Sequence, residues 1–241
     1  MAAARHPVDE LLPVQRRARI VGHGRWEAGH RWATHRAAAG YLRLQPAQPR
    51  AQRGRALLLR SAHRFTGPYD QHAVEQRPDV LVYTTPPLVT ETEVTGPVSV
   101  ALYARSSAPD TGWTAKLVDV HPDGIAVELN NGIQRASFRE ASTTPTPIQP
   151  GKVYRYTITV WPTSNLFRAG HHIRLEISSS DFPQFDSNPN TGSWLGEDTA
   201  TQVAHQTVLH DAQHPTALLL PVIPAPGSGK SSATFPISTG R

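Results

Sequence analysis

From Asp79 onward, short hydrophobic runs alternate with turn residues, which is typical of an antiparallel β-sandwich rather than of strand–helix–strand units. Successive side chains of a strand point to opposite faces, so a run with period two predicts one buried and one solvent-facing side. Three runs show this alternation clearly: VSVALYAR (98–105), VYRYTITV (153–160) and HIRLEISSS (172–180). Further strands are predicted at residues 79–85, 114–120, 125–129, 133–139 and 216–223.

Alternation also assigns individual residues to the core. The predicted core-facing residues of the first run are Val98, Val100, Leu102 and Ala104. In the third run Ile173, Leu175 and Ile177 are predicted to be buried, and Arg174, Glu176 and Ser178 to face solvent. The sequences HPDG, NNG, QPG and RAG are predicted to form turns, because glycine readily adopts positive φ. At least eight such strands indicate an all-β, two-sheet jelly-roll sandwich.

Residues 1–66 show neither a strand nor a helix period and contain little Ile, Val or Phe. With so little apolar area to offset the entropy of ordering, this segment is predicted to be largely disordered. One hypothesis is that it is out-of-frame translation of GC-rich DNA, which yields Arg, Ala, Pro and His in excess. The sandwich is predicted to span residues 67–223, and residues 224–241 to form a flexible tail.

Charge and composition narrow the possible partners. The 241-residue chain has a formal net charge of +5, but 13 arginines lie in residues 1–66 and the remainder is net negative. The folded part therefore gives no indication of nucleic-acid binding. There is no cysteine, so neither disulfides nor thiolate zinc sites are expected. No membrane-spanning run and no apolar signal core is present, so no membrane partner and a cytoplasmic location are expected.

A complete hydrolase site is not predicted. The G-x-S-x-G turn that carries the nucleophile of an α/β-hydrolase does not occur. Ser178, Ser179 and Ser180 end a predicted strand and are interpreted as turn formers. The sequence GSGKS (227–231) resembles the end of a phosphate-binding loop, G-x-x-x-x-G-K-[ST]. The first glycine of that motif would be at position 224, which is Pro224, so a phosphate-binding loop is rejected. No catalytic residue is assigned.

Several histidines and aspartates could form a catalytic base or a metal site, but surface and turn-capping roles are favoured. The histidines are interpreted as surface residues, because no acidic or cysteine partner lies at ligand spacing: His171, His172, His205, His210 and His214. The aspartates lack the regular spacing of a calcium loop and are interpreted as turn caps: Asp119, Asp123, Asp181 and Asp186. Neither a metal nor another cofactor is predicted.

Six aromatic residues leave two interpretations open, a sugar-stacking platform or core and interface packing. They are Tyr103, Trp113, Trp161, Phe167, Phe182 and Phe185. The first would make the chain an autonomous module that binds carbohydrate or another small ligand, which is the alternative function.

Three blocks, TAKLVDVHPDG, WPTSNLFRAGH and SSSDFPQFDSNPNTG, closely resemble the carboxy-terminal domain of the X-Pro dipeptidyl-peptidase and cocaine-esterase group of serine acyl hydrolases. The resemblance covers about residues 67–223 and implies a galactose-binding-like jelly roll. It implies an accessory role beside an α/β-hydrolase catalytic domain, in the same polypeptide or as a separate chain. Because the catalytic domain is missing here, the chain is expected to be inactive alone.

The resemblance also implies site residues. Leu102 and Tyr103 match the positions at which related enzymes present apolar side chains to the substrate pocket, although adjacent strand residues point to opposite faces. The residues implied in docking onto the hydrolase domain are Asp110, Trp113, Phe182, Phe185 and Asn190. Formation of a homodimer is left open.

Overall fold

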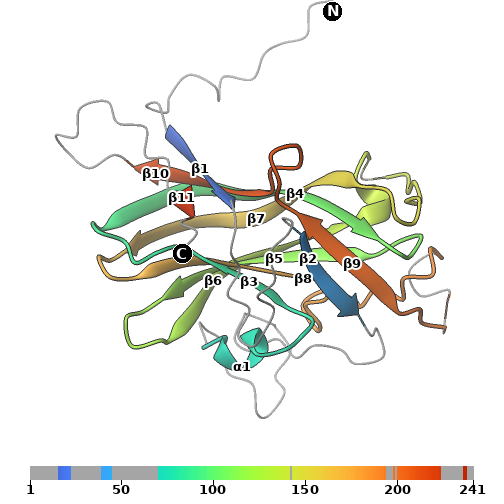
Figure 1. Ribbon diagram of the computed structural model, residues 1–241, viewed down its shortest axis with the longest axis horizontal. Helices are drawn as coiled ribbons and strands as arrows, with labels where there is room; N and C mark the ends of the chain where they lie inside the picture. Colours follow the sequence, from blue (N-terminus) through green and yellow to red (C-terminus); the bar gives the residue numbers. More distant parts are fainter. Residues whose placement is uncertain are drawn as a thin grey trace, which may run out of the picture.

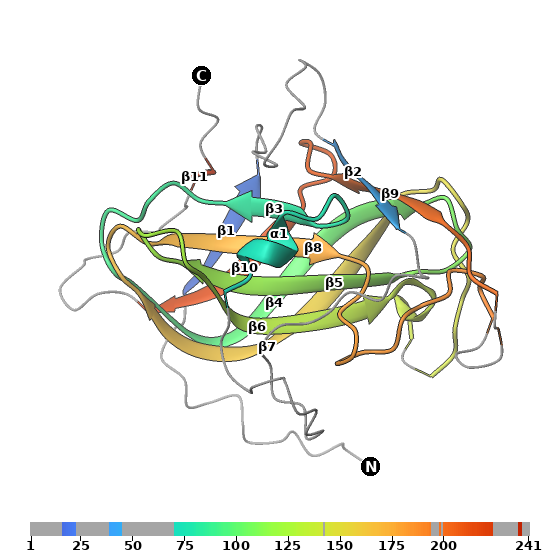
Figure 2. The ribbon, with the colours of Figure 1, turned by 90° about the horizontal axis from the view of Figure 1, so that it is seen from below.

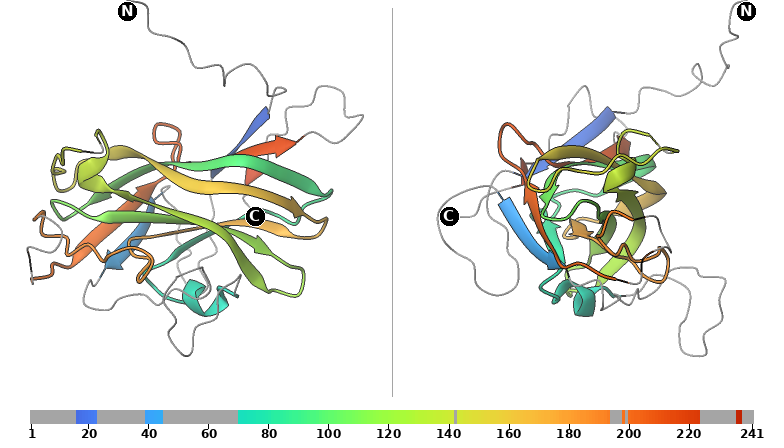
Figure 3. Two further views of the ribbon diagram at one scale, coloured as in Figure 1. Left: turned by 180° about the vertical axis from the view of Figure 1, so that it is seen from behind. Right: turned by 90° about the vertical axis from the view of Figure 1, so that its right-hand side faces the viewer.

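The protein is an all-β molecule built from two sheets (Figure 1). The computed structural model describes residues 16–22, 39–44, 70–141, 143–193, 198, 200–223 and 236–237, the two N-terminal segments and the last as backbone only. Within these residues the two sheets form stacked layers (Figure 3). The predicted two-sheet, all-β class is confirmed, whereas the jelly-roll strand order stays a prediction.

The larger sheet is organised around the long strand β4. Its strands run in the order β11-β1-β10-β4-β9-β2, with β7 paired to the other edge of β4. They are β1 (Arg16–Gly22), β2 (Ala39–Leu44), β4 (Thr92–Ser106), β7 (Tyr154–Phe167), β9 (Ala204–Leu209), β10 (Ala217–Ile223) and β11 (Pro236–Ile237). β10 and β9 follow one another along β4, so this strand connects three neighbours.

The smaller sheet has the order β3-β8-β5-β6, and all of its pairings are antiparallel. Its strands are β3 (Leu81–Thr84), β5 (Gly112–Val120), β6 (Ala126–Arg135) and β8 (His172–Ser178). β5 lies in the middle of this sheet, and all of its residues are buried. One face of β5 lies against the core between the sheets, so its other face must be covered by other parts of the chain.

The hydrophobic core lies between the two sheets. The four residues predicted from the first run are confirmed there: Val98, Val100, Leu102 and Ala104. Trp113 of β5 packs against Tyr156 of β7, with ring centroids 5.8 Å apart. The sheets approach each other closely at Gly132, where a Cβ atom would lie 2.0 Å from the carbonyl oxygen of Thr159. Glycine is therefore required at this position for the close approach of β6 and β7.

The predicted solvent-facing side of the third run is wrong at Glu176 and Ser178, both of which are buried. The short helix α1 (His72–Glu75) lies over β8 on the side away from the larger sheet (Figure 2). Arg174 of β8 contacts Glu75 of this helix through Nη1 and Oε2, 2.6 Å apart. Local alternation predicts which residues share a face, but it does not reveal what covers that face.

Three of the four glycine turns are confirmed and one is wrong. Gly124, Gly151 and Gly170 have positive φ, as predicted. The sequence NNG (130–132) instead lies inside β6, which continues to Arg135 and is followed by the 3-10 helix η2 (Ala136–Phe138). The predicted strand at 133–139 is therefore wrong at 136–139.

The two asparagine side chains of the NNG sequence form hydrogen bonds with neighbouring elements. Asn130 Nδ2 donates to the carbonyl oxygens of Trp161 and Pro162 on β7, at 2.9 and 2.7 Å. Asn131 Nδ2 donates to Asp181 Oδ2 at 2.8 Å. These residues resemble a turn in composition, but they are used for contacts between elements.

Two strands come from the segment 1–66, for which the sequence predicts little order. β1 pairs with β10 and β2 pairs with β9, both antiparallel. The rest of this segment, and all but two residues of the predicted tail, lie outside the described residues. β9 has no counterpart among the predicted strands. No helix in the described part of the chain is long and apolar enough to cross a membrane.

Candidate functional site

The two residues implied in a substrate pocket are neighbours on β4 and point in opposite directions. Leu102 is 0% exposed and lies in the core between the sheets. Tyr103 is half-buried and faces away from this core. Only Tyr103 of the pair therefore has surface that a substrate could contact. The pocket role itself stays a prediction.

Tyr103 lies against the loop that joins β9 to β10. Its ring meets the ring of His214 edge-on, with centroids 5.8 Å apart, and its main-chain N–H donates to Thr216 Oγ1 at 2.9 Å. His214 Nδ1 is 3.0 Å from Asp211 Oδ1. Desolvation raises the pKa of Asp211, but hydrogen bonds from His214 and from main-chain N–H groups outweigh it, so this pKa is lowered. We call Tyr103, Asp211 and His214 the Tyr103 patch.

Asp110, implied in docking, instead connects parts of the sandwich to each other. It is buried and forms an ion pair with Arg135 Nε. Its Oδ1 accepts the main-chain N–H of Ser137 at 2.9 Å, and its Oδ2 accepts Asn188 Nδ2 at 3.1 Å. These contacts hold η2 and the loop after β8 against the β4–β5 connection.

The other implied docking residues differ in exposure. Trp113 is fully buried between the sheets, and Asn190 is buried in a left-handed conformation with φ of 65°. Phe182 is 39% exposed and Phe185 is half-buried. In this group the two phenylalanines are the residues with appreciable surface, and the docking role stays a prediction for all of them.

The outer face of the smaller sheet carries a buried group of charges, which we call the outer-face ion cluster: Lys116, Glu128, Glu176 and Asp181. Lys116 Nζ lies 3.1 Å from Glu128 Oε2 and 3.3 Å from Asp181 Oδ1. Asn131 links the same two carboxylates from β6. One ammonium group thus faces three carboxyl groups in a region shielded from water.

Burial and charge act in opposite directions on Lys116. Burial lowers its pKa, but attraction by Glu128, Asp181 and Glu176 outweighs burial, and the pKa lies above its ordinary value. For Glu176, burial raises the pKa well above the ordinary value. Lys116 opposes this effect, whereas the nearby negative charges of Glu75 and Glu128 increase it. Glu176 therefore takes up a proton more readily than an ordinary exposed glutamate.

We expect Glu176→Gln to stabilise the protein increasingly as the pH rises. A carboxyl group whose pKa is raised on folding contributes stability below its unfolded pKa of about 4.3, and this contribution is lost as the pH rises through the folded pKa. The neutral amide avoids this loss. Melting temperatures should show a larger advantage of the variant at pH 9 than at pH 5, with about 2–4 °C for each kcal/mol.

Glu91→Gln is the matched control, because Glu91 is exposed. It should leave the melting temperature nearly unchanged at both pH values. An advantage of Glu176→Gln that is the same at pH 5 and pH 9 would contradict the raised pKa.

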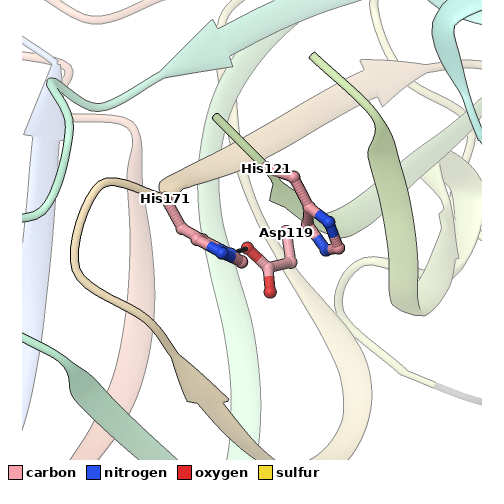
Figure 4. Close-up of side chains that lie close together, drawn as sticks. All are labelled: Asp119, His121 and His171. Atoms are coloured by element: carbon pink, nitrogen blue, oxygen red, sulfur yellow. Dashed lines mark hydrogen bonds and ion pairs between the residues drawn. The ribbon is translucent and has the colours of Figure 1, made fainter. Parts of the chain in front are cut away.

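Two His–Asp pairs occur among the described residues, Asp211–His214 and Asp119–His171. His171 Nδ1 lies 2.8 Å from Asp119 Oδ1, and the ring of His121 lies 4.6 Å from that of His171 (Figure 4). In the described part of the chain, no serine hydroxyl is hydrogen-bonded to either paired histidine. Neither pair therefore forms a Ser–His–Asp triad.

Several interpretations of histidines and aspartates need correction. His210, interpreted as a surface residue, is buried and meets Tyr83 edge-on. Asp119 and Asp181 do not act as simple turn caps but pair with His171 and Lys116, whereas Asp123 does accept a main-chain N–H in its turn. The sequence gives no sign of these pairings because the partners are distant along the chain. His121 is not among the candidate metal ligands named from the sequence. The available signal is that His121 lies two positions after Asp119, a spacing that places both side chains on the same side of a strand.

The model of the X-Pro dipeptidyl-peptidase C-terminal non-catalytic domain family matches residues 8–219. The chain belongs to this family. The resemblance seen in the sequence is thereby confirmed, and the match takes in most of the Arg-rich segment as well as the sandwich. The boundary at residue 67 stays a prediction.

The chain is similar to parts of longer proteins. It is 42% identical over 189 residues to the cocaine esterase of Rhodococcus sp. (strain MB1 Bresler), a match that covers 78% of this chain and 32% of that protein. A crystal structure of an aminopeptidase from a marine sediment Thaumarchaeota archaeon aligns with a TM-score of 0.76 at 28% identity, covering 86% of this chain and 37% of the other. An α-amino acid ester hydrolase aligns with a TM-score of 0.69 at 25% identity, covering 79% and 33%.

The chain spans about a third of the length of these relatives. It corresponds to the non-catalytic C-terminal domain of cocaine-esterase-type hydrolases.

Proposed function

We propose that this domain is the accessory β-sandwich of a serine acyl hydrolase or dipeptidyl-peptidase, inert when isolated and paired with an α/β-hydrolase catalytic domain. The observation that carries the proposal is the match of a non-catalytic family model over most of the chain, together with relatives about three times as long. The His–Asp pairs without a serine, among the described residues, support the same conclusion. The role of the sandwich is to form part of the wall of the substrate cleft.

Tyr103 is the residue that we assign to this wall. It has exposed surface on β4, and contacts from His214 and Thr216 hold it in place. A fixed aromatic side chain restrains the acyl group of a substrate, so that the scissile carbonyl stays near the nucleophile of the catalytic domain. The exposed Phe182 is assigned to docking onto that domain.

The test uses the purified chain and a chimera in which it replaces the matching segment of the Rhodococcus cocaine esterase. The chain alone should not hydrolyse an aryl ester above the uncatalysed rate, whereas the chimera should. In the chimera, Tyr103→Ala should lower kcat/KM for an aryl ester by roughly 5- to 30-fold, which corresponds to about 1–2 kcal/mol of lost apolar contact.

Trp161→Ala is the control, because Trp161 is also an aromatic residue on the larger sheet but is 62% exposed and far along β7. It should leave kcat/KM unchanged. Hydrolysis by the isolated chain that a serine-directed inhibitor abolishes would overturn the proposal. A sugar-dependent rise in melting temperature of the isolated chain would instead favour the alternative, an autonomous carbohydrate-binding module.

A further inference from the structure

Three potential metal ligands meet at one end of the smaller sheet, away from the Tyr103 patch. Asp119 is near the end of β5, His121 follows that strand, and His171 ends the turn before β8. One donor atom of each residue lies within 4.8 Å of the other two (Figure 4). Residues 50 positions apart along the chain are thus brought together by two neighbouring turns.

The two turns are in contact, which makes the site a defined feature of the fold. In the first turn, the N–H of Gly124 donates to the carbonyl oxygen of His121 at 2.9 Å. In the second, the N–H of His171 donates to the carbonyl oxygen of Arg168 at 3.1 Å. A Cβ atom on Gly170 would lie 3.5 Å from Pro122 Cγ, so the turns touch. The backbone therefore holds both histidines at a fixed distance from Asp119.

The chemistry of the donors is that of an open transition-metal site. Two imidazole nitrogens and one carboxylate oxygen are a common set for Zn²⁺, which binds them at about 2.0–2.2 Å and keeps a fourth position for water. Tetrahedral ligand atoms at such bond lengths lie about 3.4 Å apart. The donor atoms here lie within 4.8 Å of one another, so the longest separation would shorten by no more than roughly 1.4 Å. Turning of the half-buried His121 ring can supply this movement.

The side chains are also partly shielded from water. The side chain of Asp119 is 9% exposed and that of His171 is 12% exposed. The 2.8 Å contact between them already orients the imidazole toward the carboxylate. Little rotamer freedom would then be lost when a cation binds both groups.

We propose that Asp119, His121 and His171 form a binding site for a divalent transition metal of the Zn²⁺ type. The metal connects the β5–β6 turn to the β7–β8 turn and stabilises this end of the smaller sheet. Each histidine would bind the ion through an unprotonated ring nitrogen, because only that nitrogen has a lone pair to donate. The metal has a structural role, because the site lies on this domain and contains no nucleophile.

The test uses the full chain without an affinity tag, treated with chelator, then titrated with Zn²⁺ by calorimetry and with Co²⁺ by visible absorption. One equivalent of Zn²⁺ should bind, the melting temperature should rise with its concentration, and Co²⁺ should give the absorption bands of a low-symmetry four-coordinate site. His121→Asn should weaken Zn²⁺ binding by at least about tenfold and abolish these bands. Because His121 is half-buried and is the first residue of a turn, this variant should still fold.

Asp119→Asn provides a second variant, with a similar shape and a weaker ligand, and should also weaken binding. His205→Asn is the matched control, since His205 is exposed on β9, and should bind Zn²⁺ as the unchanged chain does. The proposal is overturned if the unchanged chain binds no Zn²⁺. It is equally overturned if His121→Asn and Asp119→Asn bind it with unchanged affinity, because the ion would then be held elsewhere in the chain.

Discussion

Replacing Lys116 with methionine should destabilise the protein by about 3–5 kcal/mol at pH 8, the range for removing one partner from a buried ion pair. Methionine has nearly the length of lysine, so packing is largely preserved and the lost charge dominates. Without the ammonium group, the carboxylates of Glu128 and Asp181 remain buried with no cation at 3.1 and 3.3 Å. Chemical denaturation at pH 8 measures the loss directly.

The pH dependence of this variant separates charge from packing. Its buried carboxyl groups should bind protons more readily than in the unchanged chain, so the destabilisation should shrink as the pH falls from 8 to 5. The unchanged chain should lose stability only at higher pH. Because the pKa of Lys116 is raised on folding, its contribution is present below about pH 10.5 and is lost as the pH rises through the folded pKa.

Lys152→Met is the matched control for this experiment. Lys152 is exposed, so its replacement should change the free energy of unfolding by no more than about 0.5 kcal/mol. A loss for Lys116→Met that is equally small, or that does not depend on pH, would show that the outer-face ion cluster does not stabilise the fold.

Replacing Trp113 with alanine should cost about 3–5 kcal/mol, because it removes a large side chain from the centre of the core. Trp113 is fully buried and packs against Tyr156, so the cavity would be lined by both sheets. Thermal denaturation should show a drop of roughly 6–20 °C for a domain of this size. The resemblance implies a docking role for this residue, and the structure places it where its main effect is on packing.

Trp161→Ala is the control, since this indole is largely exposed, and it should change the melting temperature little. If Trp113→Ala kept the stability of the unchanged chain but lost its association with a catalytic domain, the docking interpretation would be correct and the packing interpretation wrong.

Period-two alternation predicted the core side of β4 correctly because the direction of a strand side chain is set by its immediate neighbours. The same rule predicted that Leu102 and Tyr103 point apart. It failed for β8, whose outer face is covered by α1. The NNG sequence was misinterpreted for a related reason, since Asn131 and Gly132 serve contacts with distant elements.

From its residues alone, this chain could be recognised as a two-sheet β-sandwich of the X-Pro dipeptidyl-peptidase C-terminal type, because strand period, turn glycines and family blocks are local features. The meeting of Lys116 with Asp181, and of Asp119 with His171, depended on the folded chain. These partners lie on different strands and loops, and only strand pairing and the packing of turns determine which side chains come within 3–4 Å of each other. Local pattern thus predicts most strands between residues 79 and 223, and tertiary packing determines the charge cluster and the candidate metal site.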